Sequence, residues 1–304
     1  MPLSAAPADR LARALLSLEG LSVADAFGDQ LLRAGQLARQ YAVGERLAPS
    51  GSWPWTDDTA MAISIVEILA RHDGIEPAAL AAAFAARHAL EPARGYGGGA
   101  HLVLEAIHEG TPYEQAARRL FDGAGSCGNG GGMRAAPIGA YFADDLDAVV
   151  AHAIHSAAPT HSHPDGIAGA VAIAVAAAAT TAGARDPHTI LELAIAHTPP
   201  GPTLDGLRRA HPLVGTDPVH AATVLGNGSR ILASDTIPFA VWCAATHLTD
   251  YTSALWACAL VGGDVDTTCA MVGGILAPAL GLSSIPLAWR TAREPLPATV
   301  RLPD

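Results

Sequence analysis

The chain has an unusually uniform preference for helices. Alanine is its dominant residue, and alternating runs of Val, Ile, Thr and aromatic residues are almost absent. Because alanine has the highest helix propensity and the missing residues favour strands, we expect helices almost throughout the 304 residues. Apolar residues recur at helical spacing at Met61, Ile65 and Ile68, and such stripes pack against other helices. The sequence therefore predicts a compact all-α bundle.

Proline and glycine mark where these helices begin and end. The segment TPYE at residues 111–114 is typical of a capping box, and the Asp-Pro pairs at 186–187 and 217–218 are typical of an N-cap followed by proline. Glycines gather in four clusters, which are GYGGG from Gly95, GAGSCGNGGG from Gly123, GNG from Gly226 and GGD from Gly262. No long linker or charge block interrupts the chain, so we expect one domain over residues 1–304.

Composition excludes several classes of protein. Half of the residues are apolar and 15% are charged, which excludes a mainly disordered chain. The 18 basic and 29 acidic residues give a formal net charge of −11, so we expect neither a broad nucleic-acid surface nor a membrane partner. The most apolar stretch, residues 167–184, is largely alanine and is predicted to be a buried helix.

The four cysteines form no CxxC pair. This pattern is typical of small buried thiols in a reducing compartment. The N-terminal segment mixes acids and arginines and lacks the apolar run of a secretory leader. We therefore expect a cytoplasmic protein, and we expect it to be a monomer.

Two acidic segments stand at expected helix starts. TDDT at residues 56–59 precedes one apolar run, and GGDVDTT at residues 262–268 precedes another. Each alone fits a helix cap, because Thr and Asp suit the positive end of a helix. Two such segments, each with threonine beside paired aspartates, favour a shared site for hard divalent cations, which prefer oxygen ligands. Four carboxylates would balance the charge of two such ions.

The glycine-rich loop that begins at Gly123 lies between the acidic segments in the chain. It lacks the lysine of a P-loop and the preceding strand of a dinucleotide fingerprint. The loop is either a plain connection or a nest whose backbone N–H groups receive phosphate oxygens, with the GYGGG segment as a second contributor.

The segment PTHSHPD at residues 159–165 contains two histidines separated by one residue. His161, His163 and Asp165 could be taken for a zinc site, but no cysteine pair accompanies them, so a substrate-facing or helix-capping role is favoured for the histidines of this segment. The remaining histidines are expected on helix surfaces or ends without a role, among them His72, His88, His101, His108 and His197.

Taken in order, these motifs resemble the ADP-ribosylglycohydrolase family, which includes the dinitrogenase reductase-activating glycohydrolase. The segments that carry the resemblance are ADAFGDQ, WTDDTAMA, RGYGGG, GSCGNGGGMRAAPIG, THSHPDGIAGA, SDTIPFAVW, GGDVDTTCAMVGGILA and IPLAWR. They extend from about Leu18 to Trp289, and no single one of them is specific.

The resemblance implies an orthogonal all-α bundle with two Mg²⁺ or Mn²⁺ ions, which hydrolyses the glycosidic bond between ADP-ribose and its acceptor. Its partner would be an ADP-ribosylated protein or another ADP-ribose conjugate. The implied metal ligands come from the two acidic segments and are Thr56, Asp57, Asp58, Asp264, Asp266 and Thr267. Asp266 would bridge the ions, and Asp58 and Asp264 are the expected catalytic residues.

The resemblance also implies a binding surface for ADP-ribose. The implied substrate contacts come from the glycine segments and their neighbours and are Gly97, Gly98, Gly99, Phe121, Gly125, Ser126, Cys127, Gly128, Asn129, Gly131, Met133 and His161. Phe121 would stack on the adenine, and His161 would contact the ligand.

The chain departs from the family pattern at two places. Many members carry a glutamate a few residues beyond the glycine of the first motif, whereas here Gly28 is followed by DQLL. Asp29 or Glu45 would substitute for it, or the site differs there. Cys127 stands where some relatives place an aromatic residue beside the adenine.

The expected acceptor is arginine on protein, because family members of this type often act on it. The alternative substrates are serine-linked ADP-ribose, the ADP-ribose polymer, O-acetyl-ADP-ribose and an ADP-ribosylated nucleobase. A catalytically silent protein that binds ADP-ribose is the alternative outside the enzymes. The missing glutamate favours it, and the complete set of six implied ligands favours an enzyme.

Overall fold

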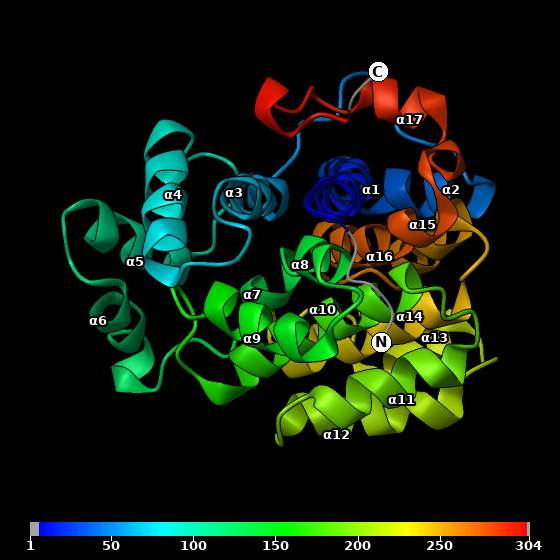
Figure 1. Ribbon diagram of the computed structural model, residues 1–304. Helices are drawn as coiled ribbons and strands as arrows, with labels where there is room; N and C mark the ends of the chain where they lie inside the picture. The colour runs from blue at the N-terminus through cyan, green and yellow to red at the C-terminus, as the bar shows by residue number, and fades with distance from the viewer. Residues whose placement is uncertain (1–5, 303–304) are drawn as a thin grey trace.

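The computed structural model describes residues 6–302, and this part of the chain contains helices and no β-strand (Figure 1). The predicted all-α bundle is confirmed. The prediction of one domain over residues 1–304 includes residues outside the described range and stays a prediction. The α-helices are α1 (Pro7–Arg33), α2 (Gln36–Glu45), α3 (Asp57–His72), α4 (Pro77–Leu90), α5 (Gly98–His108), α6 (Tyr113–Arg118), α7 (Gly130–Met133), α8 (Ala136–Tyr141), α9 (Leu146–Ala157), α10 (Pro164–Thr181), α11 (Pro187–His197), α12 (Pro202–Ala210), α13 (Pro218–Leu225), α14 (Ala233–Thr246), α15 (Tyr251–Val261), α16 (Val265–Leu280) and α17 (Leu287–Ala292).

Helices α1 and α16 form the centre of the bundle and approach each other closely. A Cβ atom at Gly20 would lie 2.3 Å from the Cβ atom of Ala277, and one at Gly273 would lie 2.5 Å from that of Ala24. Ser17 Oγ also donates a hydrogen bond to the Gly274 carbonyl at 2.7 Å. Small residues therefore allow the two backbones to touch, and this contact fixes the second half of α16 against the middle of α1.

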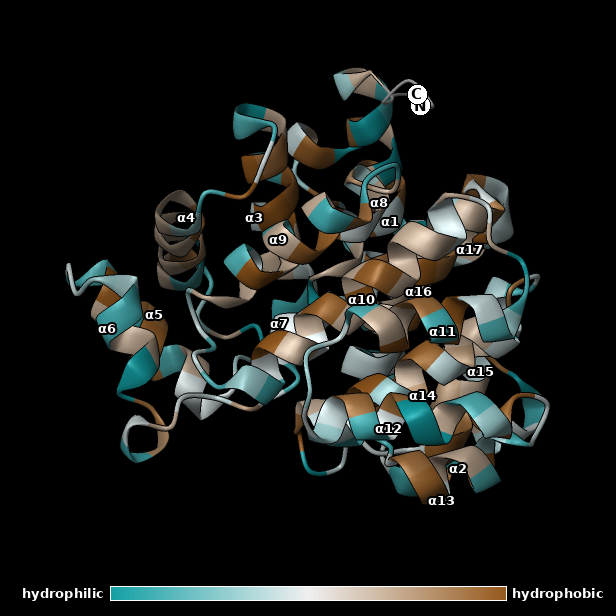
Figure 2. Cartoon of the chain, turned by 60° about the horizontal axis from the view of Figure 1, so that its bottom comes forward, coloured by the Kyte–Doolittle hydropathy of each residue, from teal (hydrophilic) through white to brown (hydrophobic). Residues whose placement is uncertain are grey.

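Helix α10 is the predicted apolar stretch. It is long and apolar enough to cross a membrane by length and composition, but 83% of it is buried inside the protein. It packs against α8, α9 and α16, and Figure 2 shows it beside α16 in the middle of the molecule. The prediction of a buried helix is confirmed, since its surface is already covered by protein.

The predicted helix starts are correct at two of three places. Asp186 and Asp217 cap α11 and α13 with their carboxylates, and a proline follows each of them. The capping box at residues 111–114 is wrong, because α6 begins only at Tyr113 and has no side-chain cap. Thr111 N instead donates to the Ala106 carbonyl, next to Gly110 with φ 96°. Thr111 therefore belongs to the closing turn of α5.

Among the described residues all four cysteines are free thiols. Cys243, Cys258 and Cys269 are buried, as expected, whereas Cys127 is only half-buried in the glycine-rich loop.

An aromatic cluster packs against α1, where the Phe27 ring stacks on the Trp289 ring with 4.5 Å between centroids. This cluster connects the C-terminal segment to the helix that carries part of the site.

Candidate active site

The two acidic segments, more than 200 residues apart in the sequence, meet at one place. Thr56 is the N-cap of α3 and Asp264 is the N-cap of α16, so both helix starts point to the same region. Thr56 Oγ1 lies 3.0 Å from Asp58 Oδ2, and Thr267 Oγ1 donates to the same oxygen at 3.4 Å. The structure thus brings together the residues that the sequence selected as metal ligands.

A fifth aspartate, Asp25, holds the first acidic segment in place. It lies in the middle of α1 and is fully buried. Its carboxylate accepts hydrogen bonds from Thr56 N at 2.9 Å, from Thr56 Oγ1 at 2.8 Å and from Thr59 Oγ1 at 2.5 Å. Asp25 was not among the site residues predicted from the sequence, although an aspartate inside the apolar run of α1 is a usable signal, since such residues are rarely buried without a partner.

Two glycines allow the segments to approach. A Cβ atom at Gly28 would lie 2.5 Å from the Asp266 Cα atom, so α1 contacts the backbone of the second acidic segment directly. Gly228 has φ 85°, and a Cβ atom there would lie 2.7 Å from the Asp264 Cβ atom. Side chains at either position would push the aspartates apart.

Burial and mutual repulsion raise the pKa values of four of these carboxyl groups. Burial is the largest cause at each one, and it raises the pKa of Asp25 to about 6. Burial and the nearby Asp25 raise the pKa of Asp57 to about 7. Burial and Asp264 raise the pKa of Asp266 to about 8. The pKa of Asp58, buried among the other four, is raised as well. The cluster therefore lacks the positive charge that would stabilise its ionised form.

The donor set fits hard divalent cations. Asp58 Oδ1 is buried and has no hydrogen-bond partner among the described residues. A buried carboxylate oxygen without a partner is costly, and a cation bound to it would remove that cost. Carboxylate and hydroxyl oxygens are the ligands that Mg²⁺ and Mn²⁺ prefer. The five aspartates with Thr56 and Thr267 thus suit the dinuclear centre implied by the resemblance.

The glycine-rich loop lies against the acidic centre through Asn129. The Asn129 amide donates to Asp264 Oδ2 at 2.7 Å and to Thr236 Oγ1 at 3.1 Å. The loop backbone also pairs with the segment before α14, because Asn129 N donates to the Ile231 carbonyl at 3.2 Å. Ser126 Oγ turns back to accept from Gly128 N at 3.2 Å. These contacts place Asn129, directly after residues 125–128, beside Asp264.

His161 lies beneath this loop. Cβ atoms at Gly130 and Gly131 would lie 3.3 and 3.6 Å from its ring, so both glycines pack flat on the imidazole. Thr160 Oγ1 is 2.7 Å from its Nδ1 atom. Burial lowers the pKa of His161 to about 3, so the ring is neutral. In this position His161 supports the loop, and its direct contact with a ligand stays a prediction.

Arg134 is a residue that the sequence analysis missed. Its guanidinium is buried and donates to the Gly130 carbonyl at 2.8 Å, to the Ser156 carbonyl at 2.9 Å and to Thr160 Oγ1 at 2.8 Å. Burial lowers its pKa to about 9. It joins the loop to the segment before His161. A lone arginine inside the apolar segment MRAAPIG is a signal that points to such a role.

The remaining implied substrate contacts lie at the edge of this region. Gly97 and Gly98 are exposed at the start of α5, and a Cβ atom at Gly99 would contact Leu120 at 3.5 Å. The next residue, Phe121, is 64% exposed and has φ 53°. Met133 is buried at the end of α7. Phe121 is therefore free to stack on a ligand, whereas Met133 packs inside the protein.

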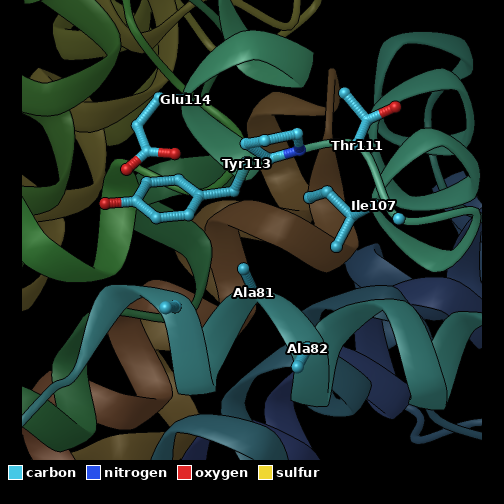
Figure 3. Close-up of a pocket in the computed structure, with 9 residues that line it drawn as sticks. Ala81, Ala82, Ile107, Thr111, Tyr113 and Glu114 are labelled. Carbon is cyan, nitrogen blue, oxygen red and sulfur yellow. The ribbon is translucent and has the colours of Figure 1, made fainter.

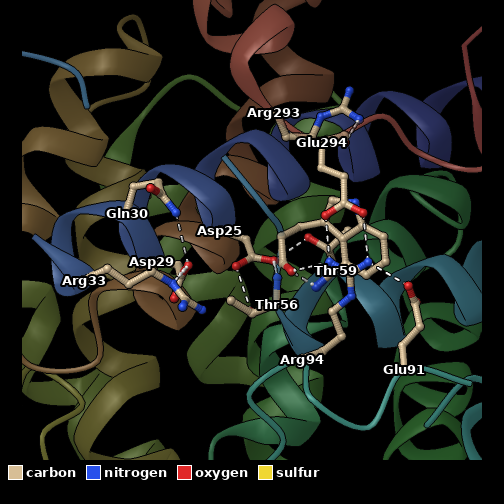
Figure 4. A network of polar contacts seen from close by, with 11 residues as sticks. Asp25, Asp29, Gln30, Arg33, Thr56, Thr59, Glu91, Arg94, Arg293 and Glu294 are labelled. Atoms are coloured by element: carbon tan, nitrogen blue, oxygen red, sulfur yellow. Dashed lines mark hydrogen bonds and ion pairs between the residues drawn. The ribbon is translucent and has the colours of Figure 1, made fainter. Parts of the chain in front are cut away.

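An ion-pair network fastens the first acidic segment (Figure 4). The Arg94 guanidinium pairs with Glu294 at 2.7 Å and with Glu91 at 2.7 Å, and it covers the Trp55 ring at 3.5 Å from the centroid. The Arg94 carbonyl accepts from Asp57 N at 2.8 Å. This network joins α3, the loop before α5 and the C-terminal segment.

Figure 4 also shows the region of the absent glutamate. Asp29 is buried on α1 next to Gly28 and pairs with Arg33 Nε at 2.5 Å. Glu45 is exposed at the end of α2. Of the two candidates, Asp29 therefore lies beside the acidic centre, with one oxygen engaged by Arg33.

One surface hollow lies apart from these residues. It has a volume of about 310 Å³ and is bounded by α4, the end of α5 and the start of α6, with Ala81, Ile107 and Tyr113 in its wall (Figure 3). None of the implied ligands or substrate contacts lines it. Apart from Glu114, its wall offers no carboxylate, imidazole or thiol, so we assign it no role in catalysis.

Comparison with known proteins gives consistent results. The family model of ADP-ribosylglycohydrolases matches residues 6–302. ADP-ribosylhydrolase ARH3 of Mus musculus is 28% identical over 274 residues, covering 79% of this chain and 73% of that protein. The ARH3 of Homo sapiens is 28% identical over 273 residues, covering 79% and 74%.

Two further comparisons extend this result. An uncharacterised protein of Archaeoglobus fulgidus is 27% identical over 265 residues, covering 84% of each chain. A solved structure described as an ADP-ribosylglycohydrolase-related protein complex has a TM-score of 0.64, covers 94% of each chain and is 24% identical. At that identity the structure shows a shared fold.

Proposed function

Since the chain belongs to the ADP-ribosylglycohydrolase family, we propose that it is a metal-dependent hydrolase that cleaves the glycosidic bond between ADP-ribose and its acceptor. The observation that carries this proposal is the cluster of five aspartates, in which the pKa values of Asp25, Asp57, Asp58 and Asp266 are raised and Asp58 Oδ1 is buried without a partner among the described residues. A protein that does not use a cation has little reason to assemble such a cluster.

In this proposal the metal ligands are Thr56, Asp57, Asp58, Asp264, Asp266 and Thr267. Two bound Mg²⁺ or Mn²⁺ ions would supply Lewis acidity and lower the pKa of a water. Asp25 would act as a positioning residue, because its oxygens are taken up by Thr56 and Thr59.

The chain's own residues would then orient the substrate and move a proton. Asn129 holds the Asp264 carboxylate in place, and this group would assist proton transfer as the anomeric carbon develops oxocarbenium character. The glycine-rich loop, supported by His161 and Arg134, would bind the diphosphate and ribose. Binding energy from that part of the substrate positions the reacting bond. Phe121 would stack on the adenine.

The acceptor is the finer part of the proposal. We take arginine-linked ADP-ribose on protein as the first substrate, and a guanidine leaving group needs a proton as it departs. Serine-linked ADP-ribose, the polymer, O-acetyl-ADP-ribose and nucleobase conjugates are the alternatives. We also propose a monomer in the cytoplasm, and the three buried free thiols support a reducing compartment.

The test is a panel of these conjugates, incubated with Mg²⁺, with Mn²⁺ and with EDTA, in which released ADP-ribose is measured. We expect release from at least one conjugate with metal and none with EDTA. Asp264→Asn should abolish the release. Asp186→Asn is the matched control, because it changes an exposed capping aspartate of α11 that lies outside the centre.

The second candidate function is a silent protein that binds ADP-ribose, which is favoured by the absence of a glutamate after Gly28. It predicts that metal and ADP-ribose raise the melting temperature while no conjugate in the panel is hydrolysed. That result would replace the hydrolase proposal.

A further inference from the structure

Helices α4 and α5 carry a second group of possible metal ligands. His88, expected on a helix surface, is instead buried on α4, with 3% of its surface exposed. His101 and Glu105 lie four residues apart on the neighbouring α5, so they share one face of that helix. One ligand atom from each of the three side chains lies within 4.8 Å of the others.

We propose that His88, His101 and Glu105 form a binding site for one Zn²⁺ ion or a similar transition-metal ion, and that this ion holds α4 and α5 together. Two imidazoles with one carboxylate are a ligand set that zinc uses, with a fourth position left for water. Imidazole nitrogen favours zinc and related ions over Mg²⁺. The site is thus different in chemistry from the acidic centre.

The present distances need one small adjustment. His88 Nε2 and His101 Nδ1 are 2.7 Å apart and share a hydrogen bond. Tetrahedral ligands with Zn–N bonds of about 2.0–2.1 Å are roughly 3.3 Å apart. The two rings must therefore separate by roughly half an ångström, and the ion replaces the shared proton between them. That proton moves to the other nitrogen of the same ring, so both imidazoles stay neutral.

The surroundings favour the neutral form that binds metal. Burial, and then the nearby His101, lower the pKa of His88. The Tyr96 ring packs edge-on against both imidazoles, at 4.9 Å from His88 and 5.9 Å from His101 between centroids. It forms an apolar wall behind the ligands, while Glu105 is exposed. An ion can thus enter from solvent and keep a water.

The same segment connects this site to the acidic centre. Tyr96 is flanked by Gly95, where a Cβ atom would lie 3.5 Å from Asp57 Oδ1. Gly97, on the other side, begins the turn that leads into α5. An ion between α4 and α5 would therefore fix the start of α5, where the exposed glycines lie.

The test is calorimetric titration of the full chain with Zn²⁺ in excess Mg²⁺, which keeps the acidic centre occupied. We expect one zinc equivalent for the wild-type protein. Each of His101→Gln and Glu105→Gln should weaken zinc binding by at least about tenfold. Glu105 is exposed, so its replacement leaves the fold intact. His72→Gln and Glu109→Gln are the matched controls at exposed positions and should keep the wild-type affinity.

A third kind of variant separates the two sites. Asp264→Asn changes the acidic centre and should still bind one zinc equivalent. The proposal is overturned if zinc does not bind in excess Mg²⁺, if His101→Gln and Glu105→Gln bind it as tightly as the wild type, or if Asp264→Asn loses it. Cu²⁺ in place of zinc adds a spectroscopic readout, because the nitrogen hyperfine pattern in its EPR spectrum should lose the contribution of one imidazole in His101→Gln.

Discussion

The acidic centre and the histidine group on α4 and α5 differ in how the fold builds them. The acidic centre joins the middle of α1 to the starts of α3 and α16, so its residues are far apart in the sequence and close in the core. The histidine group comes from two consecutive helices at the edge of the bundle (Figure 1). In the first, five carboxyl groups repel one another. In the second, two imidazoles already share a hydrogen bond. The first therefore depends on a cation much more strongly.

The largest expected effect is at the acidic centre. Asp58→Asn removes the carboxylate whose Oδ1 has no partner, and it should lower hydrolysis of the best conjugate by about 10²–10⁴-fold. Zinc binding at the histidine group should be unchanged. Release of ADP-ribose and calorimetric titration measure the two effects on the same preparation. Full activity in Asp58→Asn would remove this residue from the catalytic set.

The next effect concerns the contact between α1 and α16. Gly28→Ala adds a Cβ atom that would lie 2.5 Å from the Cα atom of Asp266. Because backbone cannot rotate away, we expect a loss of about 1–3 kcal/mol in the free energy of unfolding, together with lower metal affinity. Denaturant unfolding and Mn²⁺ titration measure both.

The matched control for this change is Gly44→Ala on α2. A Cβ atom there has no neighbouring atom within 4 Å. The free energy of unfolding of this variant should therefore increase by roughly 0.5–1 kcal/mol. If Gly28→Ala behaved like Gly44→Ala, the close approach of the two helices would not constrain the acidic centre.

The sequence predicts the acidic centre better than it predicts its supports. Thr56, Asp58 and Thr267 stand in two similar segments at helix starts, so pattern and capping rules identified them. Asp25 and Arg134 were missed, because each acts through partners that are distant in the sequence, Thr56 and Thr160 respectively. Only the packing of helices brings such partners together.

The histidine group was missed for a different reason. His88 and His101 are separated by the turn between α4 and α5, and their spacing of 13 residues matches no metal motif. The helical face of His101 and Glu105 was visible in the sequence. The burial of His88 was not, because it depends on how Tyr96 folds over the two helices.

A smaller effect concerns pH. In metal-free protein the folded pKa values of Asp25, Asp57 and Asp266, about 6, 7 and 8, lie above the ordinary value of 3.8. The folded state therefore binds more protons than the unfolded state between about pH 4 and 8. Stability is then highest at the acidic end of this window and falls as the pH rises.

Thermal unfolding in EDTA at pH 5, 6, 7 and 8 tests this expectation. We expect the melting temperature to fall by about 2–4 °C or more, the shift that about 1 kcal/mol produces. With saturating Mg²⁺ the fall should disappear, because the ions favour the ionised carboxylates. The Asp264→Asn variant should show a weaker dependence. A melting temperature in EDTA that rises from pH 5 to 8 would contradict the raised pKa values.

The smallest expected effect on activity is at the histidine group. Glu105→Gln should change hydrolysis in Mg²⁺ by less than about twofold, because Glu105 is exposed on α5 and is not among the implied metal ligands or substrate contacts. The same variant should lose the rise in melting temperature that zinc gives the wild-type protein, since an ion that binds only the folded state stabilises it. Glu109→Gln is the control for both measurements. A parallel loss of hydrolysis and zinc stabilisation would mean that the ion between α4 and α5 holds the exposed glycines Gly97 and Gly98 in the position that the substrate needs.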